Sequence, residues 1–160
     1  MEKLLLKIYG MPRLTQSLKT ISHIVVALGV VSYALLLFMG CERELTTMLK
    51  LVLVSSVPFL LVSLMRRVIN APRPYELYGF YEKRPKGKSG ESFPSRHVFS
   101  AFLISTLSIP FSIPLFIINT VISFVLAVCR VLTGMHFVRD VVAAALIGII
   151  SGVIGIFILI

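Results

Sequence analysis

The sequence predicts an all-α integral membrane protein, a helical bundle of about five transmembrane helices with a short N-terminal interfacial helix. Of its 160 residues, 57% are hydrophobic and only 14% are charged, whereas a soluble domain has an apolar fraction nearer ~45–50%. The apolar residues form uncharged runs, some as long as the ~20 residues that cross a ~30 Å hydrocarbon core. Because no repeat or low-complexity tract divides the chain, we expect one domain over residues 1–160.

The N-terminal segment, residues 1–17, mixes Lys and Arg with Leu, Ile and Tyr. This composition is typical of a helix that lies in the membrane interface, and Gly10 and Pro12 are expected to end it. The first span is expected over residues 20–41 and the second over 45–65. Both are long enough to cross the bilayer.

The next apolar run, residues 98–129, has no charge and is divided by Pro110 and Pro114. Its 32 residues are fewer than the roughly 40 that two full crossings need. Either the bilayer thins at this hairpin, or the polar ends of its two helices are recessed below the membrane surface. The last span is expected over residues 141–160, where Gly148, Gly152 and Gly155 form a face for close helix packing.

Five spans place two polar connections on the same side of the membrane. The first is the long segment 66–96, a candidate catalytic loop, and the second surrounds residues 129–140. A charged side chain at membrane depth costs roughly 2.5 kcal/mol or more, so such residues are interpreted as functional first. We therefore expect the chemistry of this chain to lie on one face.

The second connection holds the only aspartate of the chain, Asp140, four residues after His136. If a helix begins near Met135, these two side chains share one helix face. The carboxylate would then accept the proton of one ring nitrogen and leave the other to act as base, ligand or nucleophile. The alternative is an ordinary loop whose polar groups meet lipid headgroups.

Several residues around these connections are suited to binding an anion. Ser95 precedes an expected helix N-terminus, where free N–H groups and the helix dipole favour negative charge. Arginine matches the paired oxygens of a phosphate through parallel hydrogen bonds. A net charge of +9 on a membrane protein indicates anionic lipids or phosphate substrates rather than nucleic acid. Cys41 and Cys129 are too dispersed to indicate a disulfide framework or a metal site, and no cofactor is expected.

Three segments together resemble the signature of the type 2 phosphatidic acid phosphatase (PAP2) superfamily, which includes lipid phosphatases and the vanadium haloperoxidases. The segments are Arg66-x6-Arg73-Pro74, Pro94-Ser95-Arg96-His97 and Arg130-x5-His136-x3-Asp140. The chain departs from the usual pattern at three positions. Arg66 stands where Lys is usual, Arg96 where Gly is more common, and Cys129 where a Ser hydroxyl is usual.

The resemblance implies a PAP2/haloperoxidase-like helical core and a metal-free mechanism. His136 would attack phosphorus to form a phosphohistidine, Asp140 would hold its other ring nitrogen, and His97 would protonate the leaving oxygen. The phosphate would be bound by a further set of side chains. These are Arg66, Arg73, Ser95, Arg96 and Arg130.

The function expected from the resemblance is hydrolysis of a phosphate or diphosphate monoester of a lipid. Candidate substrates are phosphatidate, phosphatidylglycerophosphate and a polyprenyl diphosphate such as undecaprenyl diphosphate. The alternatives are a non-catalytic membrane protein that binds lipid phosphates, and a haloperoxidase-like enzyme that uses bound vanadate. The expected location is the cell membrane, with several spans. The distribution of Lys and Arg favours a cytoplasmic site, whereas the resemblance implies the outer face, which we expect.

Overall fold

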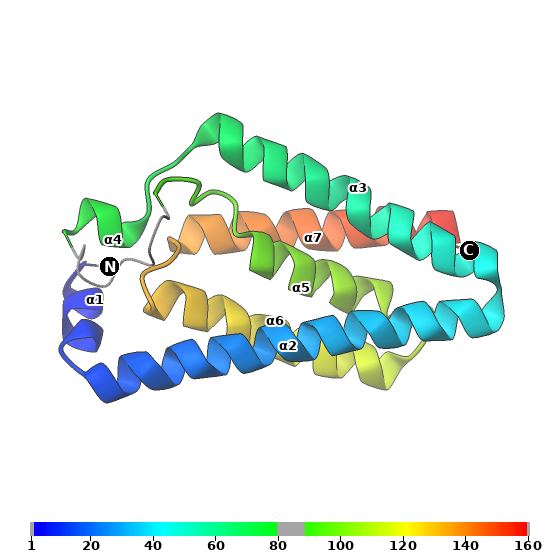
Figure 1. The fold of residues 1–160 in the computed structure, drawn as a ribbon, viewed down its shortest axis with the longest axis horizontal. Helices are drawn as coiled ribbons and strands as arrows, with labels where there is room; N and C mark the ends of the chain where they lie inside the picture. The colour runs from blue at the N-terminus through cyan, green and yellow to red at the C-terminus, as the bar shows by residue number, and fades with distance from the viewer. Residues whose placement is uncertain (1, 80–88, 160) are drawn as a thin grey trace.

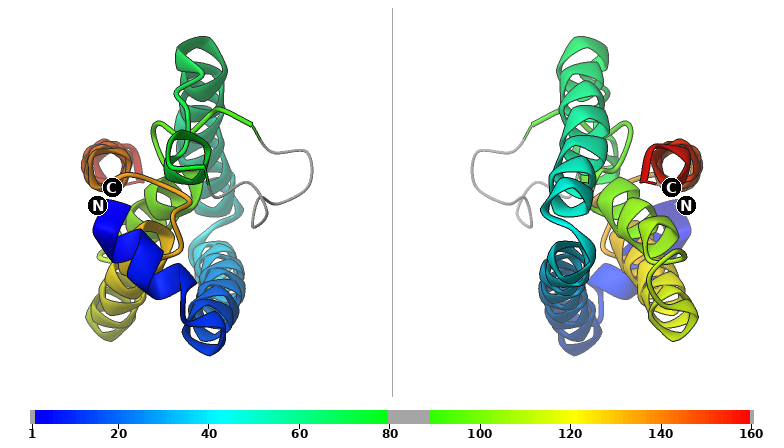
Figure 2. Two further views of the ribbon diagram at one scale, coloured as in Figure 1. Left: turned by 90° about the vertical axis from the view of Figure 1, so that its left-hand side faces the viewer. Right: turned by 90° about the vertical axis from the view of Figure 1, so that its right-hand side faces the viewer.

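The structure is a computed structural model that describes residues 2–79 and 89–159, and every regular element in these ranges is a helix. Figures 1 and 2 show the bundle that the helices form. In chain order they are α1 (Glu2–Tyr9), α2 (Pro12–Arg43), α3 (Leu45–Ile69), α4 (Pro74–Leu77), α5 (Arg96–Leu107), α6 (Ile113–Leu132) and α7 (Val138–Leu159). The predicted all-α fold is confirmed.

Four segments within the described residues are long and apolar enough to cross a membrane: Pro12–Arg43, Leu45–Leu77, Ile113–Leu132 and Val138–Leu159. The fifth apolar helix, α5, has 12 residues and is therefore only about 18 Å long. The sequence predicts that the hairpin containing α5 is short, because residues 98–129 are too few for two full spans. The bundle thus has four full-length helices around one short helix.

The short helix α5 occupies the centre of the bundle and contacts α2, α3, α6 and α7. Val98, Phe99 and Leu107 of α5 are fully buried in the hydrophobic core. Their burial removes apolar surface that would otherwise face lipid or the polar end of the bundle, and it fixes the height of α5 within the bundle. The first turn of α5, which carries Arg96 and His97, is fixed with it.

Helix α7 packs closely against α5 through its glycines. A Cβ atom on Gly148 would lie 2.6 Å from the carbonyl oxygen of Phe99, and one on Gly152 would lie 2.5 Å from Cβ of Thr106. A Cβ on Gly155 would clash with Val54 of α3. The predicted small-residue face therefore packs within the molecule.

Helix α1 lies across one end of the bundle, as Figure 1 shows. It buries Leu5, Ile8 and Tyr9 and exposes Leu4 and Leu6, which suits a helix in the membrane interface. The boundary of the predicted interfacial segment differs from the structure, because α2 begins at Pro12 rather than near residue 20. Proline is favoured in the first turn of a helix, where its missing N–H has no partner to lose.

Candidate active site

The three predicted segments meet at the end of the bundle that carries α1 and α4, visible on the left of Figure 1. Residues 89–95 connect them through backbone atoms. The N–H of Ser92 donates to the carbonyl of Ala71 at 2.8 Å, and the N–H of Ser95 donates to the carbonyl of Asp140 at 3.2 Å. The first connection reaches the loop after α3, and the second reaches α7. Parts of the chain that are distant in sequence are therefore held together at this end.

His136 is buried in the connection between α6 and α7, with 3% of its surface exposed. Its Nδ1 atom lies 2.8 Å from the carbonyl oxygen of Ser92. A carbonyl oxygen can only accept, so Nδ1 carries the proton and Nε2 holds a lone pair. This is the tautomer that a nucleophile at Nε2 requires.

The prediction that His136 and Asp140 share one helix face is wrong, whereas the role of Asp140 in holding a ring nitrogen of His136 stays a prediction. Helix α7 begins at Val138 rather than near Met135, so His136 precedes the helix instead of sharing a face with Asp140. Oδ2 of Asp140 lies 3.8 Å from Nδ1 of His136, beyond hydrogen-bond distance. The carboxylate is close enough to stabilise a positive ring, but the Ser92 carbonyl sets the tautomer.

Asp140 is fully buried and anchors the residues around the histidine. Its Oδ2 atom accepts from the Ser92 hydroxyl and from the backbone N–H of Phe137 at 2.9 Å. Nε of the exposed Arg139 lies 3.5 Å from Oδ1. Ser92 therefore contacts both members of the pair, through its carbonyl to His136 and through its hydroxyl to Asp140.

Burial is the main cause that lowers the pKa of His136, from 6.5 to about 4. The charges of Arg73 and Arg66 lower this pKa further, and the nearby Asp140 carboxylate offsets the shift only in part. Burial acts in this direction because a low-dielectric site disfavours the charged ring. The imidazole of His136 is therefore neutral at pH 7, which a nucleophile requires.

The arginine side chains of the site have N–H groups that are only partly hydrogen-bonded. Arg66 donates from Nη1 to the carbonyl of Pro94, and Arg73 donates from Nε to the carbonyl of Gly90 at 2.9 Å. Nε of Arg66, Nε of Arg130 and the hydroxyl of Ser95 are buried without a hydrogen-bond partner among the residues that the structure describes. Because buried donors are normally paired, these three groups fit an anion such as phosphate.

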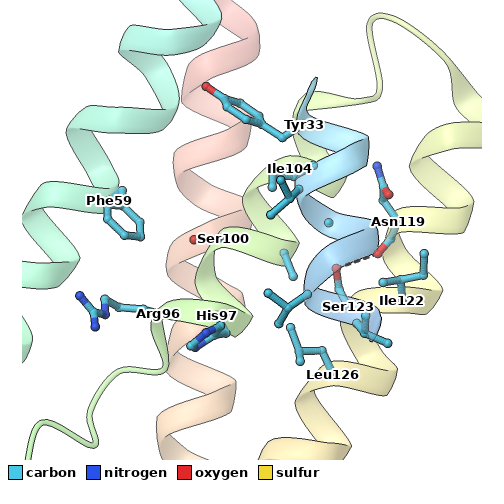
Figure 3. A pocket seen from close by; sticks show the side chains of 15 residues that line it. Tyr33, Phe59, Arg96, His97, Ser100, Ile104, Asn119, Ile122, Ser123 and Leu126 are labelled. Carbon is cyan, nitrogen blue, oxygen red and sulfur yellow. Dashed lines mark hydrogen bonds between the residues drawn. The ribbon is translucent and has the colours of Figure 1, made fainter. Parts of the chain in front are cut away.

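His97 lies in the first turn of α5 and, unlike His136, is exposed. With Arg96 it lines a cavity of about 420 Å³ between α2, α3, α5 and α6. Figure 3 shows both side chains at one end of this cavity, with apolar side chains further along it. The structure therefore places Arg96 and His97 where the site meets an apolar pocket.

Two residues that contact the site, Ser92 and Glu76, were missing from the sequence prediction. Ser92 acts through a main-chain carbonyl, which no pattern of residue types reveals. Glu76 accepts from the N–H of Arg73 at 3.0 Å and from the N–H of Gly90 at 2.9 Å. Its position three residues after Arg73, with Pro74 in the first helical position, matches a helix N-terminus, and this signal could have identified it.

Acidic, cysteine and histidine side chains do not gather into a metal-binding group anywhere in residues 2–79 and 89–159. The polar groups of the site are mainly arginines and histidines. Their chemistry suits an anion rather than a cation, because guanidinium groups only donate hydrogen bonds.

The solved structures that resemble this one include two membrane proteins. The crystal structure of LpxE from Aquifex aeolicus is 28% identical, with a TM-score of 0.71, and the match covers 97% of this chain and 93% of that chain. A transmembrane PAP2-type phosphatidylglycerolphosphate phosphatase from Bacillus subtilis shares the fold at 23% identity, with a TM-score of 0.69 and coverage of 98% and 83%. No curated protein matches the chain.

A family model for the PAP2 superfamily matches residues 31–158, a range that contains the arginine cluster, both histidines of the site and Asp140. The four segments that are long and apolar enough to span a membrane lie wholly or partly within that range. This chain belongs to the PAP2 superfamily and is a membrane phosphatase of the PAP2 type.

Proposed function

We propose that this phosphatase hydrolyses a phosphate or diphosphate monoester of a lipid through a phosphohistidine on His136. One observation carries the mechanism. Nδ1 of the buried His136 ring lies 2.8 Å from the Ser92 carbonyl, which leaves the Nε2 lone pair for attack. Arg66 and Arg73 lie close enough to act electrostatically on this ring, and they would neutralise the oxygens of a phosphate.

In the first step, Nε2 of His136 forms a bond to phosphorus as the bond from phosphorus to the lipid oxygen breaks. His97 gives its proton to that oxygen, so the lipid leaves as an alcohol, or as a monophosphate when the substrate is a diphosphate. The imidazolium that forms is stabilised by Asp140, whose carboxylate lies 3.8 Å from Nδ1. Arg66, Arg73, Arg96 and Arg130, with Ser95, would bind the phosphate oxygens.

In the second step, water attacks the phosphorus and the bond from phosphorus to Nε2 breaks. His97 accepts one proton of that water, and inorganic phosphate leaves. Both histidines then return to their starting protonation states. The scheme needs no metal ion, because arginines supply the positive charge.

A lipid substrate is supported by the surroundings of His97. The cavity that His97 and Arg96 share is lined mainly by apolar side chains, among them Val30, Phe59 and Leu126. If the arginines bind the phosphate of the substrate, the apolar tail attached to that phosphate lies beside this cavity. The candidates are phosphatidate, phosphatidylglycerophosphate and a polyprenyl diphosphate. The similar Bacillus subtilis protein is a phosphatidylglycerolphosphate phosphatase, which makes the second of these a suitable first substrate.

The test is phosphate release from these three lipids by purified protein with a chelator present. We expect turnover on at least one lipid, its abolition in His136→Asn, and a loss of about 10²- to 10⁴-fold in His97→Ala. Glu42→Gln, an exposed change near the opposite end, serves as the matched control. Full activity of His136→Asn, or a strict requirement for magnesium, would contradict the proposal.

We also propose that the site faces the outside of the cell, as expected from the family. Ser89 is exposed at the end of the bundle that carries the site, so a cysteine introduced there reports the side of the membrane. Ser89→Cys in a Cys41→Ser background should react with an impermeant maleimide in intact cells. Protection in intact cells, with labelling only after lysis, would place the site in the cytoplasm.

A further inference from the structure

The cavity beside His97 continues into a second cavity along α3. The second cavity has a volume of about 460 Å³ and shares Tyr33, Phe59, Ser100 and Ile104 with the first. Beyond these shared residues it is lined by Ser55, Ser56, Leu60 and Leu103. The two cavities together form one groove, which begins at Arg96 and His97 and runs between α2, α3 and α5.

A side-chain hydrogen bond between α2 and α3 lies where the two cavities meet. The hydroxyls of Tyr33 and Ser55 are 2.6 Å apart. The Ser55 hydroxyl has one proton and lies 2.8 Å from the carbonyl of Leu51, so Tyr33 is the donor in the pair. We name this pair the Tyr33–Ser55 latch. Figure 3 shows the Tyr33 ring at the end of the first cavity remote from His97.

The first cavity is shorter than one leaflet of a membrane. His97 and Ile104 both line it, and Ile104 lies seven positions after His97 on α5, which corresponds to about 10 Å along the helix. Half of a hydrocarbon core is about 15 Å. An apolar tail that starts at His97 would therefore reach the latch before it reached the bilayer midplane.

We propose that the Tyr33–Ser55 latch sets the length of apolar tail that the groove binds. This inference rests on the proposed function, because it requires the phosphate of the substrate to lie beside His97 and Arg96. The occupant is a single hydrocarbon tail of that substrate. Methylene groups up to the latch contact Val30, Phe59 and Ile104, and those beyond it turn out of the groove into the bilayer.

The physical consequence is a break in the dependence of kcat/KM on tail length. Each methylene that leaves the bilayer for the groove gains van der Waals contacts with the groove wall, so binding increases with each one. Methylenes that pass the latch stay in the bilayer and gain no groove contacts, so the increase ends there. Tyr33→Ala removes the ring from the wall of both cavities, and the increase should then continue to longer tails.

The experiment measures kcat/KM for straight-chain alkyl phosphates, from butyl to octadecyl, below their micelle concentrations, with the protein in nanodiscs and each substrate concentration expressed as the amount partitioned into the nanodisc bilayer. The kcat/KM of each variant is divided by the kcat/KM of the same variant for butyl phosphate. We expect the break to move to longer tails in Tyr33→Ala, and to move less in Ser55→Ala, which removes only the acceptor. Leu35→Ala, an exposed change on α2 outside both cavities, is the control and should keep the wild-type profile.

The outcomes separate this inference from the proposed function. If no alkyl phosphate or lipid is hydrolysed, the proposed function fails. If alkyl phosphates are hydrolysed but the break stays at the wild-type length in both Tyr33→Ala and Ser55→Ala, the latch is refuted and the proposed function stands. Ser55→Ala deletes only one hydroxyl, so this variant should fold. It therefore tests the latch even when Tyr33→Ala does not fold.

Discussion

His136 donates its Nδ1 proton to the main-chain carbonyl of Ser92, across a distance of 2.8 Å. The two residues are 44 positions apart in sequence. This bond joins the segment before α5 to the connection between α6 and α7, and it prepares the other ring nitrogen for chemistry. Because Ser92 also donates its hydroxyl to Asp140, one residue orients both members of the pair.

The first prediction concerns the hydroxyl of Ser92. Ser92→Ala keeps the carbonyl that holds His136 but removes a donor from the buried Asp140 carboxylate, a loss that typically costs about 1–3 kcal/mol. We expect kcat to fall by about tenfold or more with little change in KM, because the effect is on the charge that develops in the transition state. Steady-state kinetics on a water-soluble phosphate monoester checks this. Ser89→Ala, at an exposed neighbouring position, should have wild-type kinetics, and an equal loss in both variants would contradict the assignment.

The second prediction concerns Glu76 as a residue that positions Arg73. Its carboxylate accepts from the backbone of Arg73 and of Gly90, and the Gly90 carbonyl in turn accepts from the Arg73 guanidinium. We expect Glu76→Ala to raise KM by about tenfold with a smaller effect on kcat, because a displaced guanidinium binds phosphate less well.

A double-mutant cycle tests whether Glu76 acts through Arg73. In an Arg73→Ala background, Glu76→Ala should cause little further loss, since residues that act as a unit are not additive. Full additivity of the two losses would show that Glu76 acts independently of Arg73.

The third prediction follows from the pKa of His136, which burial lowers from 6.5 to about 4. Between these two values the unfolded chain binds a proton that the folded chain does not, so the free energy of unfolding falls as the pH falls. The effect is absent above pH 6.5 and complete below pH 4. At 1.36 kcal/mol for each pKa unit it amounts to about 3 kcal/mol.

Thermal unfolding at pH 7 and at pH 4.5 measures this effect. His136→Asn, whose side-chain amide can also donate to the Ser92 carbonyl, has no titrating ring. The wild type should therefore lose more stability on acidification than His136→Asn. An equal loss in the two proteins would mean that the ring is not buried in its neutral form.

The fourth prediction contrasts two helical glycines. A Cβ on Gly148 would lie 2.6 Å from the carbonyl oxygen of Phe99, whereas a Cβ on Gly29 meets nothing within 4 Å. We expect Gly148→Ala to destabilise the protein by about 1–3 kcal/mol, because α5 and α7 must separate. Gly29→Ala should be neutral or stabilising by about 0.5–1 kcal/mol, since alanine is the better helix former. Thermal unfolding of both variants checks the pair, and a reversed order would contradict the packing of α7 on α5.

Much of the architecture could be predicted from the sequence, because apolar runs of membrane-spanning length allow few alternatives. The shortness of the hairpin that α5 and α6 form followed from the number of residues between His97 and Arg130, although the sequence did not show that α5 is the short helix. The meeting of the three segments at one end followed from the parity of the spans. These are properties of chain length and composition, which the sequence contains directly.

The partner of His136 could not be predicted in the same way. The spacing of His136 and Asp140 indicates proximity, but the start of α7 at Val138 leaves the ring outside the helix. The ring then meets a main-chain carbonyl from a segment that is distant in sequence. Every residue type carries such a carbonyl, so only the tertiary structure identifies Ser92.

Trapping the phosphoenzyme shows most directly whether His136 is the nucleophile. Protein mixed with a radiolabelled lipid phosphate is quenched within one turnover in alkali, which preserves phosphohistidine, and the labelled peptide is mapped. We expect one labelled residue, His136, with phosphorus on Nε2 because Nδ1 donates to Ser92, and no label in His136→Asn. Label on Nδ1, label on another residue, or hydrolysis without any phosphoenzyme would contradict this expectation.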